Sequence, residues 1–309
     1  MRVTQTMLTQ TNLKHLSSSY NKLAQVQEQL ISGKRIQKAS EDPVVAMQGM
    51  RYRTEVREVD QFRRNVSEAT SWMDLTDSTL NEVTEAVKRI RELTTQAAND
   101  TYESSQRQII QSEVNQLIEH LGSLANAKSG EKYIYNGTKT DQPLVDMDAL
   151  KAYLADPNGD VNSIYPGGAP AASGKVAFEV SKGITVQVNM QPETVFGSDV
   201  FAGLHDLVSK LADPNTTGEV LSNELADLDV IAQNLITERA ELGARANRLE
   251  LVDNRLQEHE IIAKTIMSDN EDIDIERVIM ELKSHETVHR AALSAGARII
   301  QPTLLDFLR

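Results

Sequence analysis

Residues 59–97 read VDQFRRNVSEATSWMDLTDSTLNEVTEAVKRIRELTTQA, and this stretch decides the fold. Apolar or threonine side chains recur there in a three-then-four spacing, at Val59, Phe62, Val66, Ala69, Met73, Thr76, Leu80, Val83, Val87, Ile90, Thr94 and Ala97. The spacing places all of them on one face of a helix that packs against other helices along its length. Asp42-Pro43 predicts its start, as an N-cap followed by proline in the first turn, and Asn99-Asp100 predicts its end. Such a helix would be roughly 80 Å long.

The composition of the 309 residues limits the possible functions. Aromatic residues make up only 4%, so we expect thin helical layers rather than a thick globular core. A formal net charge of -13 argues against nucleic acid as the main partner. The chain contains no cysteine, which excludes disulfides, thiol catalysis and cysteine-ligated metals.

The sequence shows neither a membrane-spanning segment nor a secretory signal. The chain lacks an apolar run of the length that spans a membrane. Residues 1–16 (MRVTQTMLTQTNLKHL) lack the apolar segment and cleavage site of a secretory signal. We therefore expect a protein that is either cytoplasmic or exported without a cleaved signal peptide.

Other stretches predict further helices on both sides of a different central region. Helical patterns cover residues 1–31, 103–128, 201–211 and 217–268, and another follows Asp274. Residues 128–203 hold most of the glycines and prolines, and alternating strands flank a predicted hairpin turn at residues 181–183. A second turn is predicted where residues 133–135 (YIY) precede Asn136-Gly137.

The predicted fold is therefore mainly α, with a small β-rich insert and long antiparallel coiled-coil arms from both termini. We expect three domains: residues 1–42 with 268–309, residues 43–140 with 200–267, and the insert at 141–199. The predicted assembly seam, for contacts within and between subunits, comprises Leu13, Leu16, Tyr20, Leu23, Leu30, Leu282, Leu293, Ile299, Leu304, Leu305 and Phe307. The predicted rod core comprises Val59, Phe62, Val66, Met73, Leu80, Val83, Val87, Ile90, Leu117, Leu121, Leu228, Leu235, Leu242 and Leu249.

Several motifs resemble those of the flagellin-like axial proteins of bacteria. They are residues 32–36 (SGKRI) with 40–43 (SEDP), 86–93 (AVKRIREL), 239–245 (RAELGAR) and 268–274 (SDNEDID). Residues 1–5 (MRVTQ), 133–138 (YIYNGT) and 301–308 (QPTLLDFL) are similar to the members of this family that join the hook to the filament.

The resemblance implies a structural, non-enzymatic subunit without a cofactor, located outside the cell on the flagellum. It implies export by the flagellar type III apparatus and assembly as a ring of copies. The implied partners are further copies, another hook-associated protein on the hook side, flagellin on the filament side and an export chaperone, but neither nucleic acid nor membrane. Arg89, Leu93 and Glu113 match positions at which flagellins contact an innate immune receptor, although we expect no such recognition here.

Three alternatives remain open. One is a minor flagellin, and another is a cytoplasmic coiled-coil adaptor. The third is a zinc metallopeptidase, because His285-Glu286-Thr287-Val288-His289 fits the pattern of two helical histidines with a glutamate base. Only one carboxylate side chain, Asp306, follows this motif, so we expect two histidines on an interhelical face and no metal site.

The two ends of the chain carry narrow apolar stripes. Neither can bury enough surface alone to offset the roughly 1–2 kcal/mol per residue that fixing the backbone costs. We expect a protease-resistant middle, labile ends in the monomer, and ends that become ordered when neighbouring subunits cover them.

Overall fold

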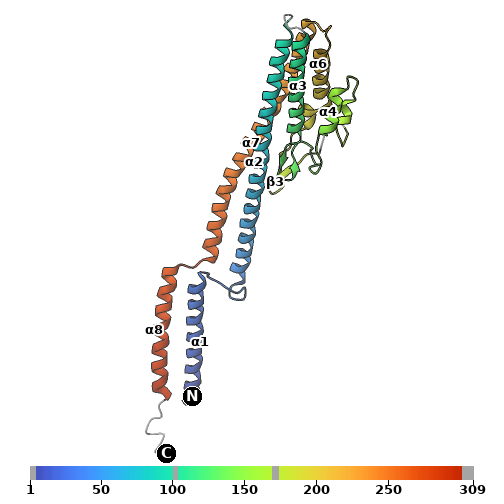
Figure 1. The fold of residues 1–309 in the computed structure, drawn as a ribbon. Helices are drawn as coiled ribbons and strands as arrows, with labels where there is room; N and C mark the ends of the chain where they lie inside the picture. The colour runs from blue at the N-terminus through green and yellow to red at the C-terminus, as the bar shows by residue number, and fades with distance from the viewer. Residues whose placement is uncertain (1–4, 100–103, 169–173, 301–309) are drawn as a thin grey trace, which may run out of the picture. The chain divides into compact units, whose positions relative to one another are not determined.

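The computed structural model describes residues 5–99, 104–168 and 174–300, and they form a mainly helical protein (Figure 1). The long helices are α1 (Gln5–Ser32), α2 (Pro43–Ala97), α7 (Gly218–Glu271) and α8 (Ile275–Ile300). The shorter ones are α3 (Ser104–Ala125), α4 (Met147–Ala155), α5 (Pro192–Phe196), α6 (Ser198–Ala212) and the 3-10 helix η1 (Val161–Ile164). Strands β1 (Lys128–Ser129) and β2 (Lys132–Tyr133) form one antiparallel pair, and β3 (Ala177–Ser181) and β4 (Ile184–Gln187) form another. The predicted fold class is confirmed.

Helix α2 follows the prediction closely. The backbone N–H groups of Val44 and Val45 each donate to Asp42 Oδ1 at 3.1 Å, so Asp42 caps the helix. Eleven of the twelve positions in the three-then-four pattern are buried, and Phe62 is half-buried. The helix ends at Ala97, two residues before the predicted stop signal.

The chain divides into two compact units. The terminal unit comprises Met1–Val59 and Glu258–Arg309, and the rod unit comprises Asp60–Gln257. Helices α2 and α7 each contribute residues to both units. The finer division into three domains stays a prediction.

The rod unit has a core built from long helical stripes. Helix α7 contributes a leucine every seven residues, at Leu221, Leu228, Leu235, Leu242 and Leu249, all buried. Of the fourteen residues predicted for the rod core, twelve are buried, while Phe62 and Leu117 are half-buried. Leu117 is only half-buried because the buried stripe of α3 runs through Val114, Ile118 and Leu121 instead.

The central region contains the predicted hairpin and additional helices. Strands β3 and β4 pair with Phe178 opposite Val186, and the chain reverses at Gly183, whose φ is +75°. Residues 132–133 pair with the preceding β1 across Gly130. Helix α4 and η1, which begin at capping aspartates Asp146 and Asp160, are not predicted from the sequence.

Candidate functional site: the paired terminal helices and their joint

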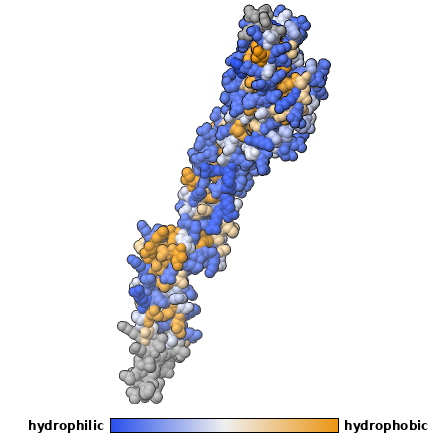
Figure 2. All heavy atoms as spheres, in the orientation of Figure 1, coloured by the Kyte–Doolittle hydropathy of each residue, from blue (hydrophilic) through white to orange (hydrophobic). Residues whose placement is uncertain are grey.

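Apolar side chains are distributed very differently over the two units. Of the 49 buried apolar residues in the described chain, 6 lie in the terminal unit. Of the 21 exposed large apolar residues, 15 lie in the terminal unit. Figure 2 shows orange apolar patches over this unit. The terminal unit therefore has little core of its own and an unusually apolar surface.

Helices α1 and α8 lie side by side in the terminal unit (Figure 1). Buried or half-buried side chains of α1 follow a three-then-four spacing at Leu16, Ser19, Leu23, Val26 and Leu30. On α8 the same spacing holds for the buried or half-buried residues Val278, Leu282, His285, His289, Ala292 and Gly296. We call these two sets the α1–α8 seam; both have the heptad spacing of a coiled coil.

The predicted assembly seam divides into two groups. Leu16, Leu23, Leu30 and Leu282 lie in the α1–α8 seam. Leu13, Tyr20 and Leu293 are instead exposed, at 59%, 60% and 47%. The side chain of Ile299, and Leu304, Leu305 and Phe307 altogether, lie outside the described residues. Val26 and Val278 are also buried, but neither belongs to the predicted assembly seam.

A set of charged side chains joins the loop after α1 to the end of α7. Arg53 donates from Nε to Glu271 Oε1 at 2.6 Å and from Nη2 to Oε2 at 2.7 Å. Lys34 Nζ lies 2.7 Å from Asp272 Oδ1 and 3.4 Å from Glu271 Oε2. We call these four residues the ion-pair joint. Glu271 is buried, so its negative charge must be stabilised by the cations Arg53 and Lys34.

Backbone contacts reinforce the joint. The N–H of Arg35 donates to Glu271 O at 2.7 Å, and that of Ile273 donates to Gly33 O at 3.1 Å. Gly33 has a φ of +68°, which ends α1 and turns the chain toward these partners. The basic loop at residues 34–38 therefore contacts the acidic link at residues 269–274 within the same chain.

The joint alters the ionisation of its acids. Hydrogen bonds from Arg53, supported by Lys34, hold the pKa of Glu271 below its usual range. A hydrogen bond from Lys34, helped by Ser268, lowers the pKa of Asp272. The same contact with Asp272 raises the pKa of Lys34. The ionised forms of all these groups are thus favoured by the fold.

The histidine motif lies on the inner face of α8. His285 and His289 are both half-buried in the α1–α8 seam, and the His289 ring lies 6.1 Å from that of Tyr20 on α1. Within the described ranges, no three His, Cys, Asp or Glu side chains lie close enough together to hold a metal ion. Asp306 lies outside the described residues.

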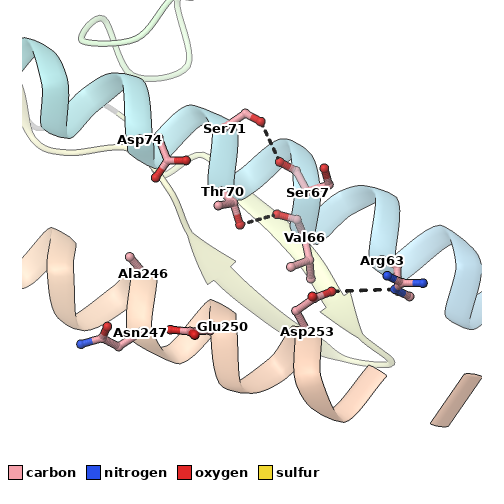
Figure 3. A pocket seen from close by; sticks show the side chains of 10 residues that line it. All are labelled: Arg63, Val66, Ser67, Thr70, Ser71, Asp74, Ala246, Asn247, Glu250 and Asp253. Carbon is pink, nitrogen blue, oxygen red and sulfur yellow. Dashed lines mark hydrogen bonds and ion pairs between the residues drawn. The ribbon is translucent and has the colours of Figure 1, made fainter. Parts of the chain in front are cut away.

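A groove of about 520 Å³ lies between α2 and α7 in the rod unit (Figure 3). Arg63 Nε and Asp253 Oδ1 form an ion pair across it, 3.8 Å apart. The hydroxyls of Thr70 and Ser71 donate to carbonyl oxygens of their own helix at 3.0 Å. The lining includes no histidine, so the groove offers no hydroxyl–imidazole pair for nucleophilic catalysis.

The positions matched to immune recognition are occupied by intramolecular contacts. Arg89 Nη2 donates to Glu113 Oε1 at 2.7 Å, and Arg89 also pairs with Glu92. Leu93 is buried in the rod core. A receptor would have to compete with these contacts.

The described helices include none that is long and apolar enough to cross a membrane.

Family models match most of the chain. The bacterial flagellin N-terminal helical region matches residues 3–140, and the bacterial flagellin C-terminal helical region matches residues 225–308. These two matches cover both helical arms and leave the central region between them.

Individual relatives match over nearly the full length. Flagellar hook-associated protein 3 of Escherichia coli is 25% identical over 96% of this chain and 96% of its own. Flagellin FlaB1 of Treponema pallidum is 24% identical over 91% of each chain. Among solved structures, a putative flagellar hook-associated protein from Vibrio parahaemolyticus has a TM-score of 0.64 and 21% identity, covering 75% of this chain and 100% of its own. The flagellar junction protein FlgL of Legionella pneumophila has a TM-score of 0.56 and 15% identity, covering 72% and 99%. The structural likeness supports the fold described above.

Proposed function

Because this chain belongs to the family of flagellin-like axial proteins, we propose that it is a structural subunit of the bacterial flagellum that forms the junction between hook and filament. The near full-length match to hook-associated protein 3 supports the junction over other positions in the flagellum. The role is mechanical, and we propose no catalytic activity and no cofactor.

The observation that carries this proposal is the incomplete core of the terminal unit. Exposed apolar residues such as Leu13 and Tyr20 on α1 and Met280 and Leu293 on α8 flank the α1–α8 seam. Such surfaces are stable in water when neighbouring subunits cover them. A subunit that is completed by its neighbours suits a ring in the wall of a tube.

The partners follow from this position. They are other copies of the chain in the ring, a hook-associated protein on the hook side and flagellin on the filament side. We further propose that an export chaperone binds the C-terminal stretch containing Leu304, Leu305 and Phe307, and that the chain leaves the cell through the flagellar export apparatus without a cleaved signal peptide. Neither nucleic acid nor a membrane is among the proposed partners.

Deletion of the encoding gene tests the junction role. The deletion strain should make hooks without filaments and release flagellin into the medium, and expression of the intact chain in trans should restore filaments. The 24% identity to a flagellin makes a minor filament subunit the second candidate. A deletion strain that still carries filaments of normal length would favour that second role and reject the first.

The metallopeptidase alternative has its own test. The purified chain should bind no stoichiometric zinc and should leave casein intact. One tightly bound zinc per chain, lost together with casein cleavage in the His289→Ala variant, would establish the enzyme instead.

A further inference from the structure

Asparagine followed by glycine occurs twice in the chain, at Asn136-Gly137 and at Asn158-Gly159. Asparagine is among the chemically labile residues of proteins. The side-chain amide of an asparagine can react with the next backbone nitrogen, and glycine has no Cβ that would shield this nitrogen. How fast each pair reacts therefore depends on how firmly the fold holds it.

The fold holds the Asn136 side chain tightly. Its Nδ2 donates to Gln142 O at 3.0 Å and to Pro143 O at 3.4 Å. Asn136 is half-buried, and the residues on either side of it, Tyr135 and Gly137, are buried. Loss of Nδ2 as ammonia would break both hydrogen bonds within this packed segment, so the fold should protect Asn136.

Asn158 lies instead on a turn between α4 and η1, where Asp156, Pro157, Asn158 and Asp160 are all exposed. The order Asp-Pro-Asn-Gly is typical of a β-turn. Two hydrogen bonds to Asp156 hold this turn: the N–H of Asn158 donates to Oδ1 at 3.0 Å, and the N–H of Gly159 donates to O at 3.1 Å. The side-chain amide of Asn158 has no hydrogen-bond partner among the described residues. Only the bond from Gly159 must open to free the reacting nitrogen, and an exposed turn opens at little cost in free energy.

We propose that Asn158 is a site of spontaneous deamidation in the folded chain, whereas Asn136 is protected. The backbone nitrogen of Gly159 attacks Cγ of Asn158 and forms a cyclic imide; Nδ2 takes up the proton from this nitrogen and leaves as ammonia. Water then opens the imide. Cleavage of the bond between the nitrogen and Cγ gives aspartate, and cleavage of the bond between the nitrogen and the main-chain carbonyl carbon gives isoaspartate. Either product adds a negative charge to the turn.

Isoaspartate would also disturb the packing beneath the turn, because it lengthens the main chain by a carbon atom. Gly159 lies against Tyr153, since a Cβ on Gly159 would be 2.7 Å from Tyr153 Cδ2. The Tyr153 ring stacks on the His205 ring with centroids 4.3 Å apart, and His205 Nε2 lies 3.0 Å from Asp156 O. The longer main chain should displace these contacts and loosen the end of α4. This chemistry belongs to the single chain, whether or not the chain serves at the junction.

Incubation of the full-length chain in mildly alkaline buffer tests the proposal. Cleavage after lysine places the two asparagines in separate peptides, residues 133–139 and 152–175, so mass spectrometry can follow each conversion against an unincubated sample. Asn158 should convert at least about tenfold faster than Asn136, a factor that corresponds to breaking the hydrogen bonds of Asn136. The Asn158→Gln variant should show no conversion at this position, because glutamine forms the imide much less readily.

Unfolding in urea is the matched control. Both asparagines precede a glycine, so they should convert at similar rates once the fold no longer distinguishes them. Similar rates in the folded chain would reject the proposal. It would also be rejected if Asn158 converted in urea but stayed intact in the folded chain.

The Asn158→Asp variant separates the effect of charge from that of the longer main chain, because it adds the charge alone. Hydrogen exchange of the α4 amides should be faster in chain enriched in isoaspartate than in this variant. Equal exchange in the two proteins would reject the proposed loosening of α4.

Discussion

Arg53 and Glu271 are separated by 218 residues in the chain, yet two hydrogen bonds of 2.6 and 2.7 Å join their side chains. One comes from each of the two long helices that pass through both units, and Lys34 approaches the same carboxylate from the loop after α1. The pair thus links the N-terminal and C-terminal arms close to the end of α1 and the start of α8. Its strength should decide how independently those two helices move.

Removing the charge of Glu271 should loosen the joint. In Glu271→Gln, Arg53 and Lys34 lose their shared buried anion, and we expect a loss of about 1–2 kcal/mol in the local stability of the terminal unit, since Arg53 and Lys34 are themselves partly exposed. Hydrogen exchange of the α1 and α8 amides measures this. Asp269→Asn, an exposed acid on the same helix, is the control and should have little effect. Equal effects of both substitutions would mean that net charge, not the joint, is responsible.

Acidification should weaken the ion-pair joint. The folded pKa values of Glu271 and Asp272 are lowered, so their contribution is fully present above the ordinary carboxyl values near 4 and is lost as the pH falls through the lowered values. Local stability of α1, followed by hydrogen exchange from pH 5 to pH 2.5, should therefore fall. The fall should be smaller in Glu271→Gln, and an identical pH profile in both proteins would contradict the assigned role.

Gly49 provides space for the carboxylate. A Cβ at this position would lie 2.7 Å from Glu271 Oε1, so Gly49→Ala should push the carboxylate out of line with Arg53. Gly243→Ala is the matched control, because Gly243 is also helical but has no atom within 4 Å of the added Cβ. We expect the control to stabilise the chain by up to about 1 kcal/mol through helix propensity, and Gly49→Ala to destabilise the terminal unit. Thermal denaturation and α1 hydrogen exchange would show it. Stabilisation by both alanines would contradict this account.

The rod unit should respond as an ordinary helical core. Leu80 is fully buried, so Leu80→Ala should cost about 2–5 kcal/mol in the free energy of unfolding. Leu251 is 71% exposed, and Leu251→Ala should change it by less than about 0.5 kcal/mol. Urea denaturation followed by the fluorescence of Trp72, the one tryptophan, reports on this unit. Similar costs for the two leucines would argue against the described core.

Strong local signals made the fold predictable from the sequence. The capping Asp42 with Pro43 and the long apolar spacing after Val59 define α2, and Gly33 marks the end of α1. Helix α4 and η1 also begin at capping aspartates, Asp146 and Asp160, but they are too short to show a long apolar spacing, and their stability depends on packing.

The candidate site was less predictable, because it depends on which faces meet. The sequence of α1 alone predicts one narrow apolar stripe that includes Leu13 and Tyr20, whereas contact with α8 leaves both exposed and buries Val26 instead. Similarly, both the basic loop and the acidic link are visible in the sequence, but local patterns do not show that Arg53 and Glu271 pair across the chain.

The central claim is that the terminal helices gain their full stability from neighbouring subunits. Hydrogen exchange of the soluble monomer, compared with the same chain in isolated flagella, tests it most directly. We predict that the amides of α1 and α8 exchange much faster than those of residues 59–97 in the monomer and become comparably protected after assembly. If α1 and α8 are already as protected in the monomer as residues 59–97, the claim is wrong, and the terminal unit is a rigid building block that needs no neighbours.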